Sequence, residues 1–464
     1  MDLLPDDVVL QVFRHVDVDD LFRCRLVCKR LGALALHPFV WRHQSFKAFN
    51  SDLRKKLCRV LRLAPCLDDL SFEMSSEGHH FPLYATTRCA VGRLNFRVPK
   101  AGGVHAALIV RNQEALGRLK DVHVGINNLP ISDATMLLGT LASTSVLEKL
   151  CVSWDGMSGG LFTASLHTSV ARPSLKYFRC QLSSESQPFI DLVLAGHAAT
   201  LEEVLLSFQS DYYFISTSTG SLPACMPNLR ELTCSLLPGL ESLASSLTKV
   251  TLHVSPDMRP GVLGATELLR RAPKLREVAL KYSPAARSPD DVGVTLVEAL
   301  AWSGRSVVEV LDIDNDCENE MDGEEDDDGV EYLPQLQPLV RALPSLPALR
   351  YIELTVYVPP DELLLAITPE TAPALRELRL YPMRWLPARC AHDWLHKDSV
   401  QTLLSLNPAL KFVVNTTPYC LKNERCGSCA QGCHNTLWEW DWEYEIGEDE
   451  DAHRSEFKEL MHIR

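Results

Sequence analysis

The stretch Leu119-Lys120-Asp121-Val122-His123-Val124 carries a pattern, L-x-x-L-x-L, that returns along most of the chain. Full or looser copies begin at positions 67, 91, 119, 147, 175, 201, 229, 247, 275, 308, 349, 375 and 410. The copies at 119, 147 and 175 start 28 residues apart, as do those at 201 and 229 and those at 247 and 275. A fixed period of this length is typical of repeat proteins, in which each unit is stacked on its neighbours.

The segments between the copies show apolar residues at helical spacing. In one of them, Ser288-Pro289-Asp290-Asp291 gives a helix-start signal, and apolar residues follow on one face as far as Leu300. Similar patterns lie at 133–141, 186–194, 336–343 and 400–406. Each unit is therefore predicted to be a short strand followed by a helix.

This period and pattern resemble the helix-backed, intracellular type of leucine-rich repeat over residues 67–415. The resemblance implies an α/β fold, a solenoid with a parallel sheet on its concave face and helices on its convex face. That family has Asn or Cys nine residues into each unit, which is present at Asn127 but missing from most other copies. The turns are therefore expected to be irregular, and the curvature is left open.

Alternate strand positions are predicted to face opposite sides of the sheet. The first, fourth and sixth positions of the pattern should enter the core, so the residues between them form a mixed polar surface on the concave face. Aromatic residues and arginines, which are favoured as binding hot spots, occur on it. We expect an unknown protein substrate to contact Tyr177, Arg179, Tyr351, Arg379 and Tyr381. The alternative for each residue is a solvated position with no ligand.

The N-terminal stretch 4–41 has a different pattern. Pro5 suits the first turn of a helix because it has no N–H to lose, and Asp6 and Asp7 favour the positive helix end. Apolar residues at three-to-four spacing predict a first helix, a second that follows Asp19-Asp20, and a third that Pro38 is expected to stop. Three helices this small cannot bury all their apolar surface, so we expect a partner to complete them.

Leu4-Pro5, Val12-Phe13, Asp20-Leu21, Val27-Cys28-Lys29-Arg30 and Trp41-Arg42 lie at the spacings of the F-box, and residues 1–42 resemble that family. Two positions depart from it: Leu31, where the family often has Trp, and Val40, where it usually has Leu. The resemblance implies docking onto the Skp adaptor of a cullin–RING ubiquitin ligase. The expected adaptor-binding residues are Leu4, Pro5, Val8, Val12, Phe13, Leu21, Cys24, Val27, Cys28 and Trp41. The alternative is an ordinary helical cap on a larger core, which would require these matches to coincide by accident.

Residues 43–66 carry apolar side chains among Lys and Arg in an amphipathic helical pattern that ends at Ala64-Pro65. We expect them to form a linker helix that fixes the angle between the F-box and the repeats.

An acidic insert, 312–331, explains the long gap between the copies at 308 and 349. A calcium loop needs Gly at its sixth position and Glu at its twelfth; counted from Asp312, these positions hold Cys317 and Gly323, so that reading fails. A self-repelling surface loop is favoured, with the exclusion of acidic partners or the recruitment of basic ones as a secondary possibility.

The C-terminal stretch 416–464 is rich in cysteine and aromatic residues. Cys426, Cys429, Cys433 and His434 supply four potential zinc ligands, but no second C-x-x-C pair completes a known finger, so free or partly buried thiols are favoured. Residues 438–446 alternate strictly between aromatic or apolar and acidic residues. We interpret this stretch as a cap on the last repeat, with an aromatic docking strip as the alternative.

Composition narrows the function. The net charge of −14 over 464 residues argues against nucleic acid, and no apolar run approaches the ~18 residues that would span a membrane. No secretory signal is seen, and the fifteen cysteines are mostly scattered singly, which indicates a reduced protein of the cytoplasm or nucleus. No phosphate-binding glycine loop, H-E-x-x-H or G-x-S-x-G is present, and no cysteine has a recognisable activating context, so we expect neither an enzyme nor a cofactor.

The leading hypothesis is a substrate-recognition subunit of an SCF-type ubiquitin ligase, which reaches a cullin and a RING protein through the Skp adaptor. A second hypothesis is a non-proteolytic scaffold that uses the same adaptor without a cullin. A third makes the C-terminal cysteines a zinc or redox site.

Overall fold

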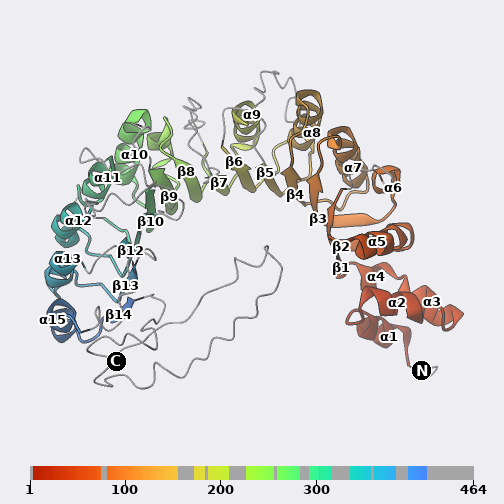
Figure 1. The fold of residues 1–464 in the computed structure, drawn as a ribbon, viewed down its shortest axis with the longest axis horizontal. Helices are drawn as coiled ribbons and strands as arrows, with labels where there is room; N and C mark the ends of the chain where they lie inside the picture. Colours follow the sequence, from red (N-terminus) through yellow and green to blue (C-terminus); the bar gives the residue numbers. More distant parts are fainter. Residues whose placement is uncertain are drawn as a thin grey trace, which may run out of the picture. The chain divides into compact units, whose positions relative to one another are not determined.

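A computed structural model describes residues 4–74, 81–154, 172–182, 186–207, 226–254, 259–282, 292–302, 304, 306–315, 335–356, 360–382 and 396–414. The chain divides into two compact units, Met1–Thr233 and Cys234–Arg464. Within each unit, helices line one side of a series of strands (Figure 1).

The first unit begins with four short helices, α1 (Asp6–Phe13), α2 (Val18–Cys24), α3 (Lys29–Ala35) and α4 (Pro38–Trp41). Trp41 is completely buried among them, its ring centroid lies 5.4 Å from that of Phe22, and its indole N–H donates a hydrogen bond of 2.7 Å to the carbonyl of Ala35. The Asp17 carboxylate caps α2 by accepting from the Asp20 N–H at 2.8 Å. The four helices therefore enclose a small core of their own.

The sequence predicted three helices here, the third of them ending before Pro38, and it missed the fourth helix. The third helix ends at Ala35, and Pro38 instead occupies the first turn of α4, after the His37 ring has accepted from the Phe39 N–H at 3.2 Å. A proline fits this place because the first helical turn leaves its N–H groups unpaired.

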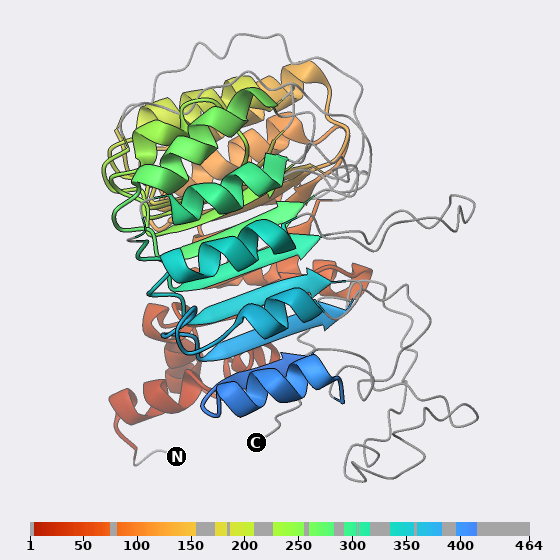
Figure 2. The ribbon, with the colours of Figure 1, turned by 90° about the vertical axis from the view of Figure 1, so that its left-hand side faces the viewer.

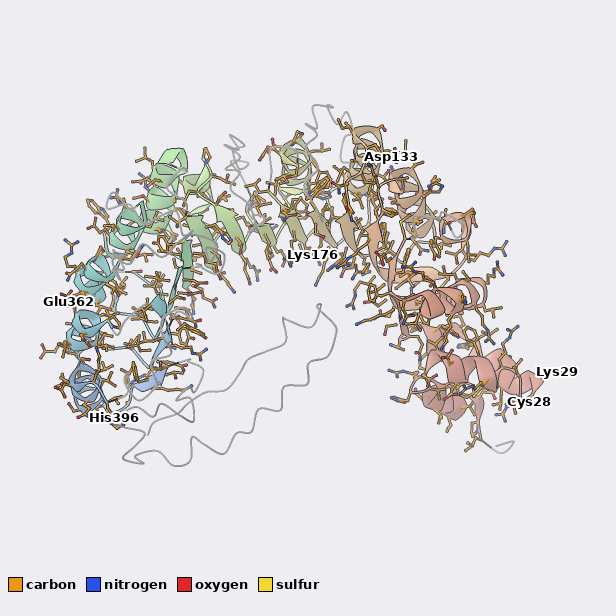
Figure 3. All side chains as sticks on the ribbon, in the orientation of Figure 1. Cys28, Lys29, Asp133, Lys176, Glu362 and His396 are labelled. Carbon is orange, nitrogen blue, oxygen red and sulfur yellow. The ribbon has the colours of Figure 1, made fainter. Side chains whose placement is uncertain are left out.

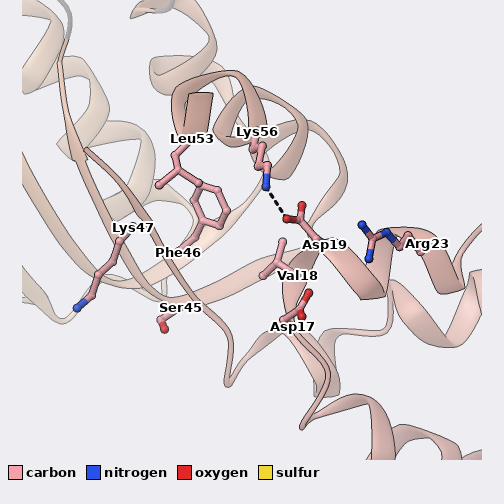
Figure 4. Close-up of a pocket in the computed structure, with 9 residues that line it drawn as sticks. All are labelled: Asp17, Val18, Asp19, Arg23, Ser45, Phe46, Lys47, Leu53 and Lys56. Carbon is pink, nitrogen blue, oxygen red and sulfur yellow. Dashed lines mark hydrogen bonds and ion pairs between the residues drawn. The ribbon is translucent and has the colours of Figure 1, made fainter. Parts of the chain in front are cut away.

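The predicted linker helix is also corrected. Residues Ser45–Ala48 form a strand, β1, which pairs in parallel with β2 (Cys66–Glu73), and only Ser51–Leu63 is helical, as α5. The sheet therefore begins before residue 67, where the sequence placed its start. Side chains from α5 reach back to the N-terminal helices. Lys56 pairs with Asp19 at 2.5 Å (Figure 4). The Arg59 guanidinium lies 4.5 Å from the ring centroid of Phe22.

The repeats of the first unit continue this arrangement, with strands paired in parallel in the order of the sequence. Their elements are α6 (Phe81–Thr86), β3 (Ala90–Val98), α7 (Gly103–Ala115), β4 (Asp121–Ile126), α8 (Ile131–Ser143), β5 (Lys149–Trp154), β6 (Tyr177–Gln181), α9 (Gln187–His197), β7 (Glu203–Ser207) and the start of β8 (Glu231–Ser235), a strand that continues past the unit's last residue, Thr233.

The second unit has the same construction. Its parallel strands run in one direction with the helices on one face (Figure 2). Its elements are η1 (Leu240–Leu243), β9 (Lys249–Val254), α10 (Arg259–Arg271), β10 (Glu277–Tyr282), α11 (Val292–Ala301), β11 (Val310–Asn315), α12 (Leu336–Ala342), η4 (Leu343–Ser345), β12 (Tyr351–Val356), α13 (Asp361–Ala366), β13 (Glu377–Pro382), α15 (Asp398–Leu406) and β14 (Lys411–Val414).

Burial follows the pattern predicted from the sequence. In β4 the side chains of Val122 and Val124 are buried, as is Leu119 just before the strand, while Asp121 and His123 lie on the face without helices, called here the open face. The predicted fold class, N-terminal helices followed by a leucine-rich-repeat type of strand–helix array, is therefore confirmed.

Two other predictions meet the structure only in part. Asp312–Asn315, which the sequence assigned to the acidic insert, belong to β11, because Leu311 and Ile313 fill core positions and the acids alternate with them. The rest of the insert and the C-terminal stretch 416–464, with its cysteines, lie outside the described residues. Among the helices that are described, none has the length and apolar character needed to cross a membrane.

Buried polar side chains at two helix ends supply hydrogen bonds to the backbone where a strand begins. Gln113 of α7 accepts from the Val91 N–H at 2.9 Å and donates to the Cys89 carbonyl at 3.1 Å. His197 of α9 accepts through Nδ1 from the N–H groups of Ser174 and Leu175 at 3.1 and 3.3 Å. Burial lowers the pKa of His197 to about 4, which keeps the ring neutral and able to accept.

This geometry predicts an acid sensitivity. The folded state holds His197 neutral down to about pH 4, whereas the unfolded chain takes up the proton near its ordinary pKa of 6.5. The free energy of unfolding should therefore fall as the pH drops through that interval, by up to about 3 kcal/mol. His197→Gln keeps a hydrogen-bond acceptor but has no group that titrates. In urea unfolding, this variant should therefore lose this part of the pH dependence of the unfolding free energy. The control His43→Gln, at an exposed position, should show the wild-type pH dependence. An unchanged pH slope in His197→Gln would contradict the assignment.

Candidate functional site

The N-terminal helical domain exposes apolar side chains on α1 and in the turn between α2 and α3. Val8 and Val12, four residues apart on one side of α1, are 40% and 51% exposed, and Leu4, just before this helix, is 43% exposed. Leu26 and Val27 in the turn are more open still, at 77% and 69%. Large apolar residues this accessible, on so small a domain, mark a surface for a protein partner.

Arg30 holds the two parts of this surface together. Its Nε donates to the Asp6 carboxylate at 2.8 Å, and its Nη2 donates to the Leu4 carbonyl. The start of α1, with Leu4 and Pro5, is thereby tied to α3, three residues after Val27. Cys28 is exposed and lies with Lys29 at the outer end of the domain, away from the strands of the first unit (Figure 3).

Three of the ten predicted adaptor-binding residues are not on this surface. Phe13, Leu21 and Trp41 are buried in the domain's own core, at 4%, 1% and 0% exposure. Their side chains offer no surface to a partner in this structure, which corrects the prediction that they make the contact themselves. Leu4, Pro5, Val8, Val12, Val27 and Cys28 are exposed, and Cys24 is half-buried. The domain therefore buries Phe13, Leu21 and Trp41 in its own core, although the sequence predicted that a partner would cover them.

On the open face of the first unit, the predicted residues Tyr177 and Arg179 lie two positions apart on β6. Tyr177 is half-buried and Arg179 is exposed. The ammonium of Lys149, the register partner of Tyr177 on β5, lies 5.8 Å from the centroid of the Tyr177 ring. An aromatic ring between cations suits a ligand with both apolar and anionic groups.

His123 is the register partner of Cys151 and lies beside Asp121 on the same face. Its Nε2 lies 3.1 Å from the Asp121 carboxylate. The hydrogen bond to Asp121, followed by one with Cys151, raises the pKa of His123 to about 10, so the imidazole is a cation at neutral pH.

On the open face of the second unit, the other three predicted residues come together. The Arg379 guanidinium lies 5.3 Å from the Tyr351 ring centroid, pairs with Glu377 at 2.7 Å, and donates to the Tyr381 hydroxyl at 3.4 Å. The Tyr351 hydroxyl donates to Glu353. The predicted hot-spot residues are thus restrained by one another, and much of their hydrogen-bonding capacity is used within the face.

Acidic groups adjoin this cluster. Asp312 is the register partner of Glu353, and Asp314 accepts from Thr355 at 2.7 Å and pairs with Lys281 at 3.4 Å. Burial, followed by the charge of Glu353, raises the pKa of Asp312 to about 7. Among the described residues, no group of three or more His, Cys, Asp or Glu is placed to hold a metal ion.

Comparison with known families decides the nature of the N-terminal domain. Residues 1–47 match the F-box-like family. The chain therefore combines an F-box-like domain with strand–helix repeats, as the resemblance in the sequence implied. Comparison with curated proteins gave no match. Among solved structures, the crystal structure of a Rad7 and Elc1 complex in yeast is similar over 88% of this chain and 92% of that chain, at 14% identity and a TM-score of 0.39.

Sequence reasoning missed two residues of the F-box-like surface. Leu26 lies inside the run Cys24-Arg25-Leu26-Val27-Cys28, where spacing alone does not separate core from surface. Arg30 pairs with Asp6, which lies 24 residues earlier in the chain, and no local pattern signals that contact.

The charge on His123 is open to a direct measurement. Asp121→Asn removes the carboxylate that holds the proton, so the pKa of His123 should fall from about 10 toward its ordinary value of 6.5. Histidine ring resonances followed by NMR against pH should show this shift. Glu148→Gln removes a carboxylate that pairs with Lys120 at the edge of the same strand, and it should leave the titration unchanged. Equal titration of His123 in the wild type and in Asp121→Asn would refute the pairing.

Proposed function

We propose that this chain is the substrate-recognition subunit of an SCF-type ubiquitin ligase. The observation that carries the proposal is the exposed apolar surface of the F-box-like domain, Leu4, Val8, Val12, Leu26 and Val27, next to a repeat array with an open sheet face in the same unit. The F-box-like domain binds the Skp-type adaptor through this surface, and the cullin and the RING protein join through the adaptor. The repeats bind a protein substrate.

The chain contributes proximity and not bond chemistry. Holding a substrate near a conjugating enzyme raises the effective concentration of its lysine side chains near the ubiquitin thioester. Side chains of this chain need only bind and orient the substrate, and no catalytic group of its own is required. We place the protein in the cytoplasm or the nucleus, where the substrate would meet the ligase.

Several contacts fix the F-box-like domain to the repeats of its own unit. The side-chain amide of Gln44 donates to the carbonyl of Val16 at 3.1 Å. The backbone carbonyl of Gln44 accepts from the Asp68 N–H of β2 at 2.9 Å. Together with Lys56–Asp19 and Arg59–Phe22, these contacts join the two parts through polar, aromatic and backbone groups. A receptor of this kind benefits because a fixed junction sets the distance between the adaptor and a substrate held on the first unit.

The surface assignment predicts loss of the adaptor on mutation. Leu4→Ala/Pro5→Ala removes exposed apolar contacts without touching the domain's core, so co-purification with the Skp-type adaptor should fall by about tenfold or more. The control Leu108→Ala/Met136→Ala trims equally exposed apolar side chains on α7 and α8, and it should leave co-purification intact. Adaptor binding retained by the Leu4/Pro5 variant would overturn the site.

Ligase membership has its own measurement. A wild-type complex captured with neddylation blocked should contain cullin and RING protein, and the Leu4/Pro5 variant should lose both together with the adaptor. Capture of the adaptor without cullin would instead favour a non-proteolytic scaffold.

A further inference from the structure

The open face of β3 to β6 presents its cations outward and its carboxylates beneath them. The side chains of Arg93 and His123 are 51% and 44% exposed, and Lys149 is exposed as well, whereas those of Asp69 and Asp121, on the same face, are only 18% and 17% exposed. A ligand approaching this face therefore meets positive groups first, although the numbers of acids and bases on the strands are similar.

Strand register brings five such groups into one strip, which we call the basic strip: Arg93, Arg97, His123, Lys149 and Arg179. Its central row runs across the strands from Asn95 through His123 and Cys151 to Arg179 and contains no acid. Nitrogen-tipped side chains project from this face of the first unit (Figure 3). Adjacent strands lie about 4.8 Å apart, so the strip from β3 to β6 is about 14 Å long, which an extended peptide covers with four or five residues.

The carboxylates beneath do not engage Arg93 closely. The nearest oxygens of Asp68, Asp69 and Asp121 lie 3.7, 3.7 and 3.9 Å from its guanidinium nitrogens. Outside the strip, Lys120 and Glu148 at the strand edges pair at 2.6 Å, a full charge-assisted hydrogen bond. The guanidinium of Arg93 thus keeps hydrogen-bonding capacity for an outside carboxylate.

We propose that the basic strip binds a short acidic segment, rich in Asp and Glu, of the protein substrate. This inference rests on the proposed function and adds the chemical class of the segment recognised. The carboxylates of the segment pair with Arg93, His123, Lys149 and Arg179, and the Tyr177 ring supports the neighbouring apolar atoms. On the open face of the second unit, Asp312 lies opposite Glu353, and the cations Lys281 and Arg379 are already paired with Asp314 and Glu377, so that face suits an acidic segment less well.

A nucleic acid suits these observations less well. The chain carries a net charge of −14, which opposes a long polyanion, and the strip is too short to follow many phosphates. A short carboxylate-bearing peptide requires only the local field of the strip, which acts within about 8 Å at physiological salt.

The test uses the full chain in complex with its Skp-type adaptor and measures fluorescence anisotropy of a labelled octaglutamate peptide. Octalysine and an eight-residue oligothymidylate serve as comparison probes. Lys149→Gln/Arg179→Gln removes two cations of the strip, and Lys100→Gln/Arg172→Gln removes two exposed cations of the same unit away from the strands. Lys149→Arg/Arg179→Lys keeps the charge. Thermal unfolding and adaptor co-purification are recorded for every variant.

We expect octaglutamate to bind, octalysine not to bind, and the Lys149→Gln/Arg179→Gln variant to weaken binding about tenfold. The Lys100/Arg172 control and the charge-conserving variant should stay near the wild-type affinity. Equal weakening in the control, or no binding of octaglutamate, would overturn the inference, and tighter binding of the oligothymidylate would replace it with a nucleic-acid site. If adaptor co-purification survives in those cases, the proposed function stands and only the acidic segment fails.

Discussion

Backbone hydrogen bonds between parallel strands hold each repeat in register with the next, and the organisation of both units depends on this pairing. Val122, Leu150 and Phe178 are register partners in three successive strands, and all are buried. Because the core positions align, the side chains between them are forced into rows across the open face. Each row therefore brings together side chains from several strands, such as Arg93, Asp121 and Lys149 in the first unit and Asp312, Glu353 and Arg379 in the second.

The repeated strands and most helices could be predicted from the sequence because L-x-x-L-x-L states both the period and the buried face. The misses have a common physical origin. In β1, Phe46 and Ala48 carry the alternation over only four residues, and nearby Phe49 and Leu53 extend it into an apparent helix. In β11, Asp312 and Asp314 resemble the acidic insert that follows them, although they alternate with buried Leu311 and Ile313. Short or charged strands are recognised only once their neighbours are in place.

The candidate surface could be predicted in kind but not residue by residue. Val12 and Phe13 are adjacent in the sequence, and a family motif includes both, yet one is half exposed and the other is buried. The difference depends on how α1 packs against α3 and α4, which spacing along α1 does not reveal. Trp41 shows the same limit: it matches the motif because the domain needs a central aromatic residue, and not because a partner contacts it. His197 and Arg30 act through long-range contacts, across 22 or more residues, that no local pattern encodes.

The contacts of Gln44, Lys56 and Arg59 have a mechanical consequence. A flexible linker would let the F-box-like domain change its orientation relative to the repeats. A substrate bound to the repeats would then occupy many positions relative to the adaptor. Here the backbone passes directly from the last helix of that domain into the first strand of the sheet, with side chains braced on both sides. A force applied to the domain is therefore transmitted directly to the first strands. The distance between the F-box-like domain and the open face of the first unit is fixed when the chain folds.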